Sequence, residues 1–194
     1  MFARLLVTCA LVGFGAVAPS PAVAQDATTL HGAWFGGGIG TASAQVNCEL
    51  CINDRNGGLS GYLAGGLRLN AGLHAGAELA GWFDNTDDVS QRLLLYGASL
   101  WWHPRPGQNW FLKGGLGLLK YRAATDDDDD DPLTAGTAAI QLGGGYDLRA
   151  GRKLWVSPFA NLIVTTSGNM TSGNTVVTDA SFSMLQLGAG VTWR

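Results

Sequence analysis

The stretch LSGYLAGGLRLNAGLHAGAELAGWF, from Leu59 to Phe83, consists of two alternating segments joined by the short turn Asn70-Ala71-Gly72. From Leu59 to Leu69, every second residue is leucine or glycine, and the residues between them are small or polar. After the turn, apolar residues alternate in the same way with residues that include Glu78. Because successive side chains of a strand point to opposite faces, each segment predicts a strand with one apolar face and one small or polar face.

The same alternation continues through most of the chain, and helical periodicity is nearly absent. Near the C-terminus, Leu185, Leu187 and Val191 alternate with Gln186 and Gly188. A tilted strand of about 9–11 residues is long enough to cross a membrane. We therefore predict an all-β fold, an eight-stranded antiparallel up-and-down transmembrane β-barrel, with strands at Ala33–Ser43, Leu59–Leu69, Leu73–Phe83, Gln91–His103, Trp110–Arg122, Thr137–Leu148, Leu154–Thr165 and Ser181–Trp193.

The connections between these strands alternate in length. The tight ones are Asn70-Ala71-Gly72, Pro104–Asn109 and Arg149–Lys153. The longer and more polar ones are Ala44–Gly58, Asp84–Ser90, Ala123–Gly136 and Thr166–Ala180. Short turns on one side and long loops on the other are typical of membrane-spanning barrels. With eight strands, both chain ends are predicted on the side of the short turns.

Aromatic residues collect at the ends of the predicted strands. On the apolar face, Phe83 falls at the rim that carries the long loops, and five others fall at the short-turn rim, namely Phe35, Trp102, Trp110, Tyr146 and Trp193. Amphipathic rings prefer a membrane interface, because one end of the ring system is apolar and the other is wet. This clustering favours an aromatic girdle over the core of a soluble sandwich.

Residues 1–24 contain the three parts of a secretory signal peptide in the expected order. Arg4 supplies the positive charge, and Leu5–Ala18 is an apolar stretch that is too short to span a bilayer as a helix. Ala22-Val23-Ala24 matches the cleavage rule of small residues on either side of a variable one. We predict cleavage between Ala24 and Gln25, and one barrel domain over residues 25–194.

The composition excludes several classes of function. Charged residues make up 14% of the chain and the formal net charge is −3, and no basic patch predicts binding to nucleic acid. After residue 24, no apolar run reaches the roughly 18 residues of a transmembrane helix. The sequence implies no cofactor and no specific metal site.

Together, the signal peptide, the eight alternating strands, the alternating loop lengths and the C-terminal strand MLQLGAGVTW resemble the small outer-membrane β-barrel proteins of the OmpA/OmpX type. In that family the terminal aromatic residue is thought to be read by the barrel-insertion machinery, whereas here Arg194 follows Trp193. The resemblance implies a location in the Gram-negative outer membrane. The implied partners are outer-membrane lipid and lipopolysaccharide, with the insertion machinery during assembly, and the oligomeric state stays open.

The small or polar face is predicted to line the lumen, which in an eight-stranded barrel is only wide enough for side chains. Buried charges need partners, and Arg68 and Glu78 are expected to pair because they lie on neighbouring strands. The polar residues predicted to point inward are Arg68, Glu78, Lys113, Gln141, Asp147 and Gln186. Two interpretations remain open: a polar plug that fills the lumen, and a narrow water-filled pore.

Two features fall in the predicted long loops. Cys48 and Cys51 form a CELC motif that predicts a local disulfide in an oxidising compartment. The run from Asp126 to Asp131 predicts a solvated loop, with loose binding of divalent ions as the alternative. The carboxylates concerned are Asp126, Asp127, Asp128, Asp129, Asp130 and Asp131.

The expected function is a structural or anchoring role, or narrow passive transport. One alternative is a secreted lipocalin-like barrel, in which the apolar face points inward around a ligand. A second is a lipid-modifying enzyme, but no Ser–His–acid set follows from the positions of His74, His103, Ser99 and Ser157, so no catalytic residue is predicted. Pro158 predicts a bulge or bend in its strand, because proline cannot donate a ladder hydrogen bond.

Overall fold

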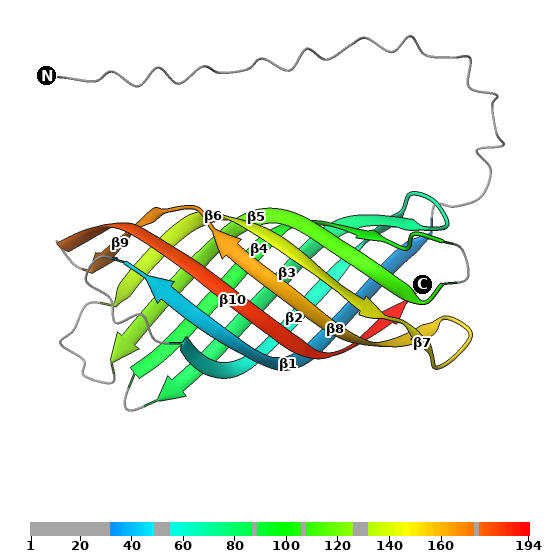
Figure 1. Cartoon of the computed structure of the whole chain (residues 1–194), viewed down its shortest axis with the longest axis horizontal. Coiled ribbons are helices and arrows are strands. Elements are labelled where there is room, and N and C mark those ends of the chain that lie inside the picture. Colours follow the sequence, from blue (N-terminus) through cyan, green and yellow to red (C-terminus); the bar gives the residue numbers. More distant parts are fainter. Residues whose placement is uncertain (1–31, 49–54, 87–88, 106–107, 126–131, 173–174) are drawn as a thin grey trace, which may run out of the picture.

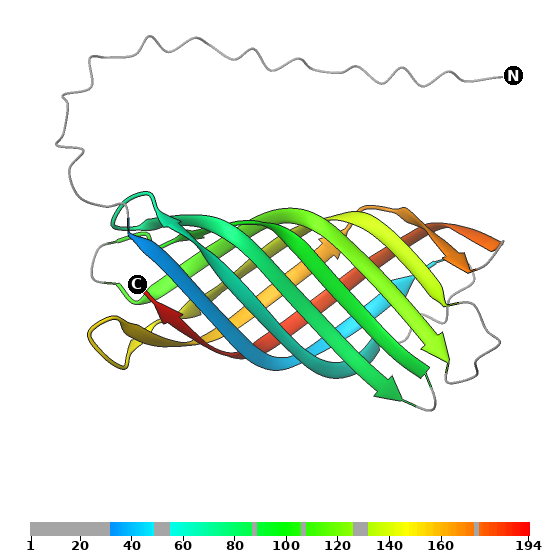
Figure 2. The same cartoon turned by 180° about the vertical axis from the view of Figure 1, so that it is seen from behind.

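The computed structural model describes residues 32–48, 55–86, 89–105, 108–125, 132–172 and 175–194. These residues form a closed ring of tilted strands, seen from two sides in Figures 1 and 2. The strand segments are β1 (Ala33–Asn47), β2 (Arg55–Arg68), β3 (Leu73–Thr86), β4 (Val89–Trp102), β5 (Trp110–Thr125), β6 (Leu133–Tyr146), β7 (Leu148–Arg149), β8 (Leu154–Thr165), β9 (Gly168–Ser172) and β10 (Thr175–Trp193). No helix in this part of the chain is long and apolar enough to cross a membrane.

The ring closes through the first and last strands. Neighbouring strands pair antiparallel from β1 to β6, and β6 pairs with β8, β8 with β10, and β10 with β1. The segment β9 continues the line of β8 between β6 and β10, and the two-residue β7 pairs with the start of β8. The predicted eight-stranded antiparallel barrel is therefore confirmed. Closure gives β1 to β6, β8 and β10 a neighbouring strand on both sides, and a lipid environment requires such pairing of the backbone groups.

The apolar face of the strands points outward. On β2, Leu59, Leu63 and Leu67 are 64%, 65% and 53% exposed, whereas Ser60 and Tyr62 between them are buried. The same alternation holds on the other strands, and it places leucine, valine and isoleucine side chains on the outer surface. An outer surface of this kind contradicts the lipocalin-like alternative, because that barrel would turn its apolar face inward.

The predicted girdle residues lie on the outer face. All five are exposed, namely Phe35, Trp102, Trp110, Tyr146 and Trp193. They lie at the end of the barrel that carries the short turns, where β1 begins and β10 ends. We call this end the turn end and the opposite one the loop end. The rings of Phe35 and Trp193 stack across the closure of the barrel, with centroids 5.1 Å apart.

At the loop end the strands extend further than the sequence predicts. Asn85 pairs with Ser90, within a connection that we predicted to be a loop, and Ala123 pairs with Leu133. The connection from 166 to 180 contains β9 and the first part of β10. The prediction was too short because it followed apolar alternation, whereas the backbone ladder continues wherever two strands stay adjacent, whatever their side chains.

The predicted bulge at Pro158 is wrong. Ala189 lies opposite Pro158 without a shift in register, and the gap between β6 and β7 lies across from Pro158 on its other side. The missing N–H therefore falls where the ladder is already interrupted. The irregularity lies instead in β10, between Val177 and Ala180, where Asp179 has a φ of 58°.

Candidate functional site

A charged cluster occupies the middle of the lumen. The Lys113 Nζ on β5 lies 2.7 Å from Glu78 Oε1 on β3, and the Gln141 Nε2 on β6 donates to the same oxygen at 2.7 Å. The side chains of Lys113 and Glu78 are each 1% exposed. A buried ion pair requires this kind of additional hydrogen bond, because water no longer solvates the charges.

Aromatic rings surround this ion pair. The Lys113 Nζ lies 4.8 Å from the centroid of the Tyr62 ring and 5.1 Å from that of Trp101, which are cation–π distances. Tyr62 meets Phe159 edge-on at 4.9 Å, and Trp101 stacks on Phe111 at 4.9 Å. Only β1 and β10 separate β2 from β8, and the rings of Tyr62 and Phe159 meet over Gly38 and Gly188 on the inner face of these two strands.

Two of the other three residues of the predicted polar set, Gln186 and Arg68, lie apart from this ion pair. Gln186 is fully buried and accepts a hydrogen bond of 2.9 Å from Asn161 Nδ2. The expected pair of Arg68 and Glu78 is wrong, because Glu78 pairs with Lys113. The register explains this: Arg68 lies opposite His74, nearer the turn end, while Glu78 lies opposite Ala64.

Asp147 belongs to a second cluster, at the turn end. Its Oδ2 lies 2.9 Å from His103 Nε2 and bonds to the guanidinium of Arg194, and its Oδ1 accepts from Ser157 Oγ. Asp147 follows the girdle residue Tyr146 and lies between β6 and β7, outside the membrane-spanning strands. Burial raises the pKa of Asp147, but the bonds with His103 and Ser157 and the charge of Arg194 outweigh burial and hold this pKa below its ordinary value.

This cluster contains a serine, a histidine and an acid, but their order differs from a hydrolase triad. Ser157 donates to the carboxylate of Asp147, and the His103 ring also contacts that carboxylate. In a nucleophilic triad the histidine lies between the other two, so that it can take the proton of the hydroxyl. The geometry therefore orients His103 and Arg194 around a central anion.

The loop-end part of the lumen is apolar. Its buried side chains include Leu93, Leu95, Leu119, Ile163, Met170, Phe182 and Met184. The prediction of a polar interior is therefore incomplete: apolar side chains dominate the loop-end part, with few polar groups such as Thr137 and the Tyr121 hydroxyl among them. The sequence did not reveal this layer because leucines occupy consecutive positions 93–95 and 118–119, where alternation fails.

The predicted loop features lie mainly outside the described residues. Cys48 is disulfide-bonded, and Cys51 lies outside the described residues. The carboxylates 126–131 and the signal peptide also lie outside them. Among the residues that the structure describes, no group of three or more histidine, cysteine or acidic side chains could hold a metal ion.

Sequence reasoning missed the aromatic residues of the lumen and Asn161. Tyr62, Trp82, Trp101 and Phe159 occupy the same alternate positions as the predicted polar residues of their strands. That alternation was the available signal. Large rings on the inner face take up much of the lumen, which in so narrow a barrel is only wide enough for side chains.

Comparison with known proteins supports this architecture. The outer membrane protein beta-barrel domain model matches residues 7–192. The crystal structure of Neisserial surface protein A superimposes with a TM-score of 0.58 at 17% identity, covering 84% of this chain and 98% of that one. The attachment invasion locus protein Ail of Yersinia pestis gives 0.53 at 14% identity, covering 82% and 98%. No curated protein matches the chain by sequence.

These likenesses in structure show the fold, and the family model covers nearly the whole length of the chain. The chain belongs to the outer membrane protein beta-barrel domain family and is a protein of the bacterial outer membrane.

Proposed function

We propose that this protein is a structural outer-membrane barrel with a closed lumen, which anchors its external loops and does not conduct solutes. The observation that carries the proposal is the contact of Lys113, Glu78 and Gln141 in the middle of the lumen. These side chains come from β5, β3 and β6, and they meet with only 1% of the lysine and glutamate side chains exposed.

The layers on either side of this cluster support the same role. Towards the loop end, a solute would meet apolar side chains such as Leu93, Leu119 and Phe182, all buried. Towards the turn end it would meet Trp34, whose ring lies 5.2 Å from that of Trp101. An ion that passed through the apolar layer would lose its hydration without gaining hydrogen bonds, which costs several kcal/mol.

Single-channel recording in planar lipid bilayers tests the proposal. We expect no conductance steps from the refolded wild-type protein. Truncation of two lumen rings in Tyr62→Ala/Trp101→Ala should produce steps. The matched control is Tyr96→Ala/Trp102→Ala, which removes the same two residue types from the outer face of β4 and should stay silent. Regular conductance by the wild type would contradict a closed lumen and favour narrow passive transport.

The proposed role includes no catalysis. We expect mass spectrometry of lipid A to give the same profile in cells with and without the protein. A new acylated or deacylated species that depends on His103 or Ser157 would favour the lipid-modifying alternative.

A further inference from the structure

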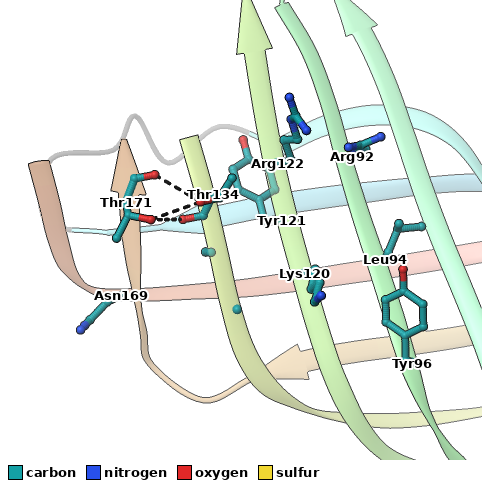
Figure 3. Close-up of a pocket in the computed structure, with 11 residues that line it drawn as sticks. Arg92, Leu94, Tyr96, Lys120, Tyr121, Arg122, Thr134, Asn169 and Thr171 are labelled. Carbon is teal, nitrogen blue, oxygen red and sulfur yellow. Dashed lines mark hydrogen bonds between the residues drawn. The ribbon is translucent and has the colours of Figure 1, made fainter. Parts of the chain in front are cut away.

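Three cations form a cluster on the outer surface near the loop end. Arg92 on β4 lies directly opposite Arg122 on β5. Lys120 is two residues before Arg122 on the same outward face of β5, and it lies opposite Leu94. All three side chains are exposed to the outside of the barrel. Figure 3 shows the two guanidinium groups above Leu94, Tyr96 and the Lys120 amine.

This arrangement is unfavourable for the protein alone. Directly opposed side chains on neighbouring strands lie about 5 Å apart at Cβ, and like charges there repel. None of the three cations forms an ion pair with an acidic residue of the described chain. An anion between them would convert the repulsion into attraction, and Arg in particular binds phosphate through paired N–H groups.

Space for such an anion exists. The cations line a pocket of about 440 Å³ whose far side is formed by Thr134 on β6 and Thr171 on β9. Gly136 lies opposite Lys120, and a Cβ added there would meet nothing within 4 Å. The two threonine hydroxyls form a hydrogen bond of 3.2 Å with each other (Figure 3), and their remaining lone pairs can accept from the hydroxyls of a sugar.

The cluster lies at the level of lipid headgroups. From the girdle residue Trp110 to Arg122, β5 rises about 30 Å along the barrel axis, given about 3.3 Å per residue and a tilt of about 40°. The apolar band of such barrels is about 25 Å tall. Exposed Leu118 and Tyr96 fall within the upper part of that band, and the cations fall just above it.

An acyl-sized groove adjoins the cation pocket. A second outer hollow, of about 270 Å³, shares Leu94 with it and runs over Gly61 and Gly81 between the side chains of Leu63, Leu79 and Phe83. Its lining is almost wholly apolar. A cationic pocket that continues downward into an apolar groove matches a ligand with a phosphorylated sugar head and hydrocarbon chains.

We propose that Arg92, Lys120 and Arg122 bind the phosphates of lipid A in the outer leaflet, with one acyl chain in the groove beside Leu94. The loop end faces this leaflet, because barrels of this class turn their short connections to the periplasm. This site lies on the outside of the barrel, so it is independent of whether the lumen conducts.

Binding of purified lipid A tests the proposal, with the protein refolded in a neutral detergent and the dissociation constant measured at low and moderate salt. The triple variant Arg92→Gln/Lys120→Gln/Arg122→Gln should bind bisphosphorylated lipid A at least ten-fold more weakly than the wild type. The wild type should bind dephosphorylated lipid A as weakly as the variant binds the phosphorylated form. Inorganic phosphate should bind only weakly, because it lacks the acyl chains.

The matched control is Arg55→Gln/Arg149→Gln/Arg152→Gln, which removes three exposed arginines elsewhere. Its affinity for lipid A should equal that of the wild type. The proposed site is wrong if both triple variants lose the same affinity for lipid A. It is also wrong if Arg92→Gln/Lys120→Gln/Arg122→Gln binds lipid A like the wild type, or if the wild type binds dephosphorylated lipid A as tightly as the bisphosphorylated form. Inorganic phosphate binding as tightly as lipid A would also contradict the site. Circular dichroism checks folding, and single variants Arg92→Gln and Lys120→Gln carry the test if the triple variant does not fold.

Discussion

Lys113 and Lys120 lie on the same strand, β5, but in opposite environments. Lys113 points into the lumen, where it pairs with Glu78 at 2.7 Å, while Lys120 points outward beside two arginines and has no ion pair with a described residue. Inside, the low dielectric makes an unpaired charge too costly, so the protein supplies the partner itself. Outside, at the membrane boundary, the surroundings can supply it. The inner cation therefore contributes to the fold, and the outer ones to what the barrel binds.

The largest expected effect comes from removing the inner cation. Lys113→Met leaves Glu78 buried without its partner and should lower the free energy of unfolding by about 3–5 kcal/mol. Urea unfolding in lipid vesicles measures this. The double variant Glu78→Gln/Lys113→Met should recover most of the loss, and Lys120→Met, on the outer face of the same strand, should change little. A Lys113→Met barrel as stable as the wild type would show that the ion pair is unimportant.

Introducing a cation on the lipid face should rank next. Leu187, 53% exposed on the outside of β10, has neither a partner nor a headgroup nearby. Leu187→Arg should cost about 2–4 kcal/mol at mid-membrane. Val176→Arg, at the loop end of the same strand and in the same cross-strand row of residues as Arg122, should cost about 0–1 kcal/mol. Equal costs at the two positions would contradict our placement of the membrane, and vesicle unfolding is again the measurement.

The turn-end cluster predicts a dependence on pH. Asp147→Asn should lower the free energy of unfolding by about 1–3 kcal/mol at pH 7. Because the pKa of Asp147 is lowered in the folded state, its stabilisation is fully present above the ordinary carboxyl pKa of about 4. It is lost as the pH falls through the lower folded value.

The difference between wild type and Asp147→Asn should therefore shrink on acidification. Asp179→Asn is a suitable control, because Asp179 is exposed and asparagine also tolerates its φ of 58°. A difference that stays constant down to pH 2 would argue against a charged Asp147 as the source.

The smallest effect should have the opposite sign. In neutral detergent without lipid A, Arg92→Gln removes a like charge opposite Arg122 and should raise the free energy of unfolding by a few tenths of a kcal/mol. High salt should abolish the gain, because exposed charges are screened. Thermal unfolding at two salt concentrations measures it, and a loss of stability at low salt would mean that Arg92 has a partner within the protein.

Some features were predictable because they repeat locally. The alternation correctly identified Leu63 and Leu67 on β2 as outward, and Glu78 on β3 and Gln186 on β10 as inward. Local alternation failed where it was absent, as at Leu93 and Leu95. Alternation also does not show how close neighbouring strands come. A Cβ at Gly66 would clash with the backbone of Ala75 and Gly76, which makes this position intolerant of any side chain.

The sequence by itself determined the class of fold, the face of most strands that meets lipid, and the end that carries the short turns, because these follow from a period of two and from turn composition. Only the tertiary structure decided that Glu78 pairs with Lys113 instead of Arg68, that Asp147 meets Arg194, and that Arg92 faces Arg122. The physical reason is that the height at which two side chains meet depends on the stagger and closure of all the strands. That stagger belongs to the ring as a whole and cannot be read from any single strand.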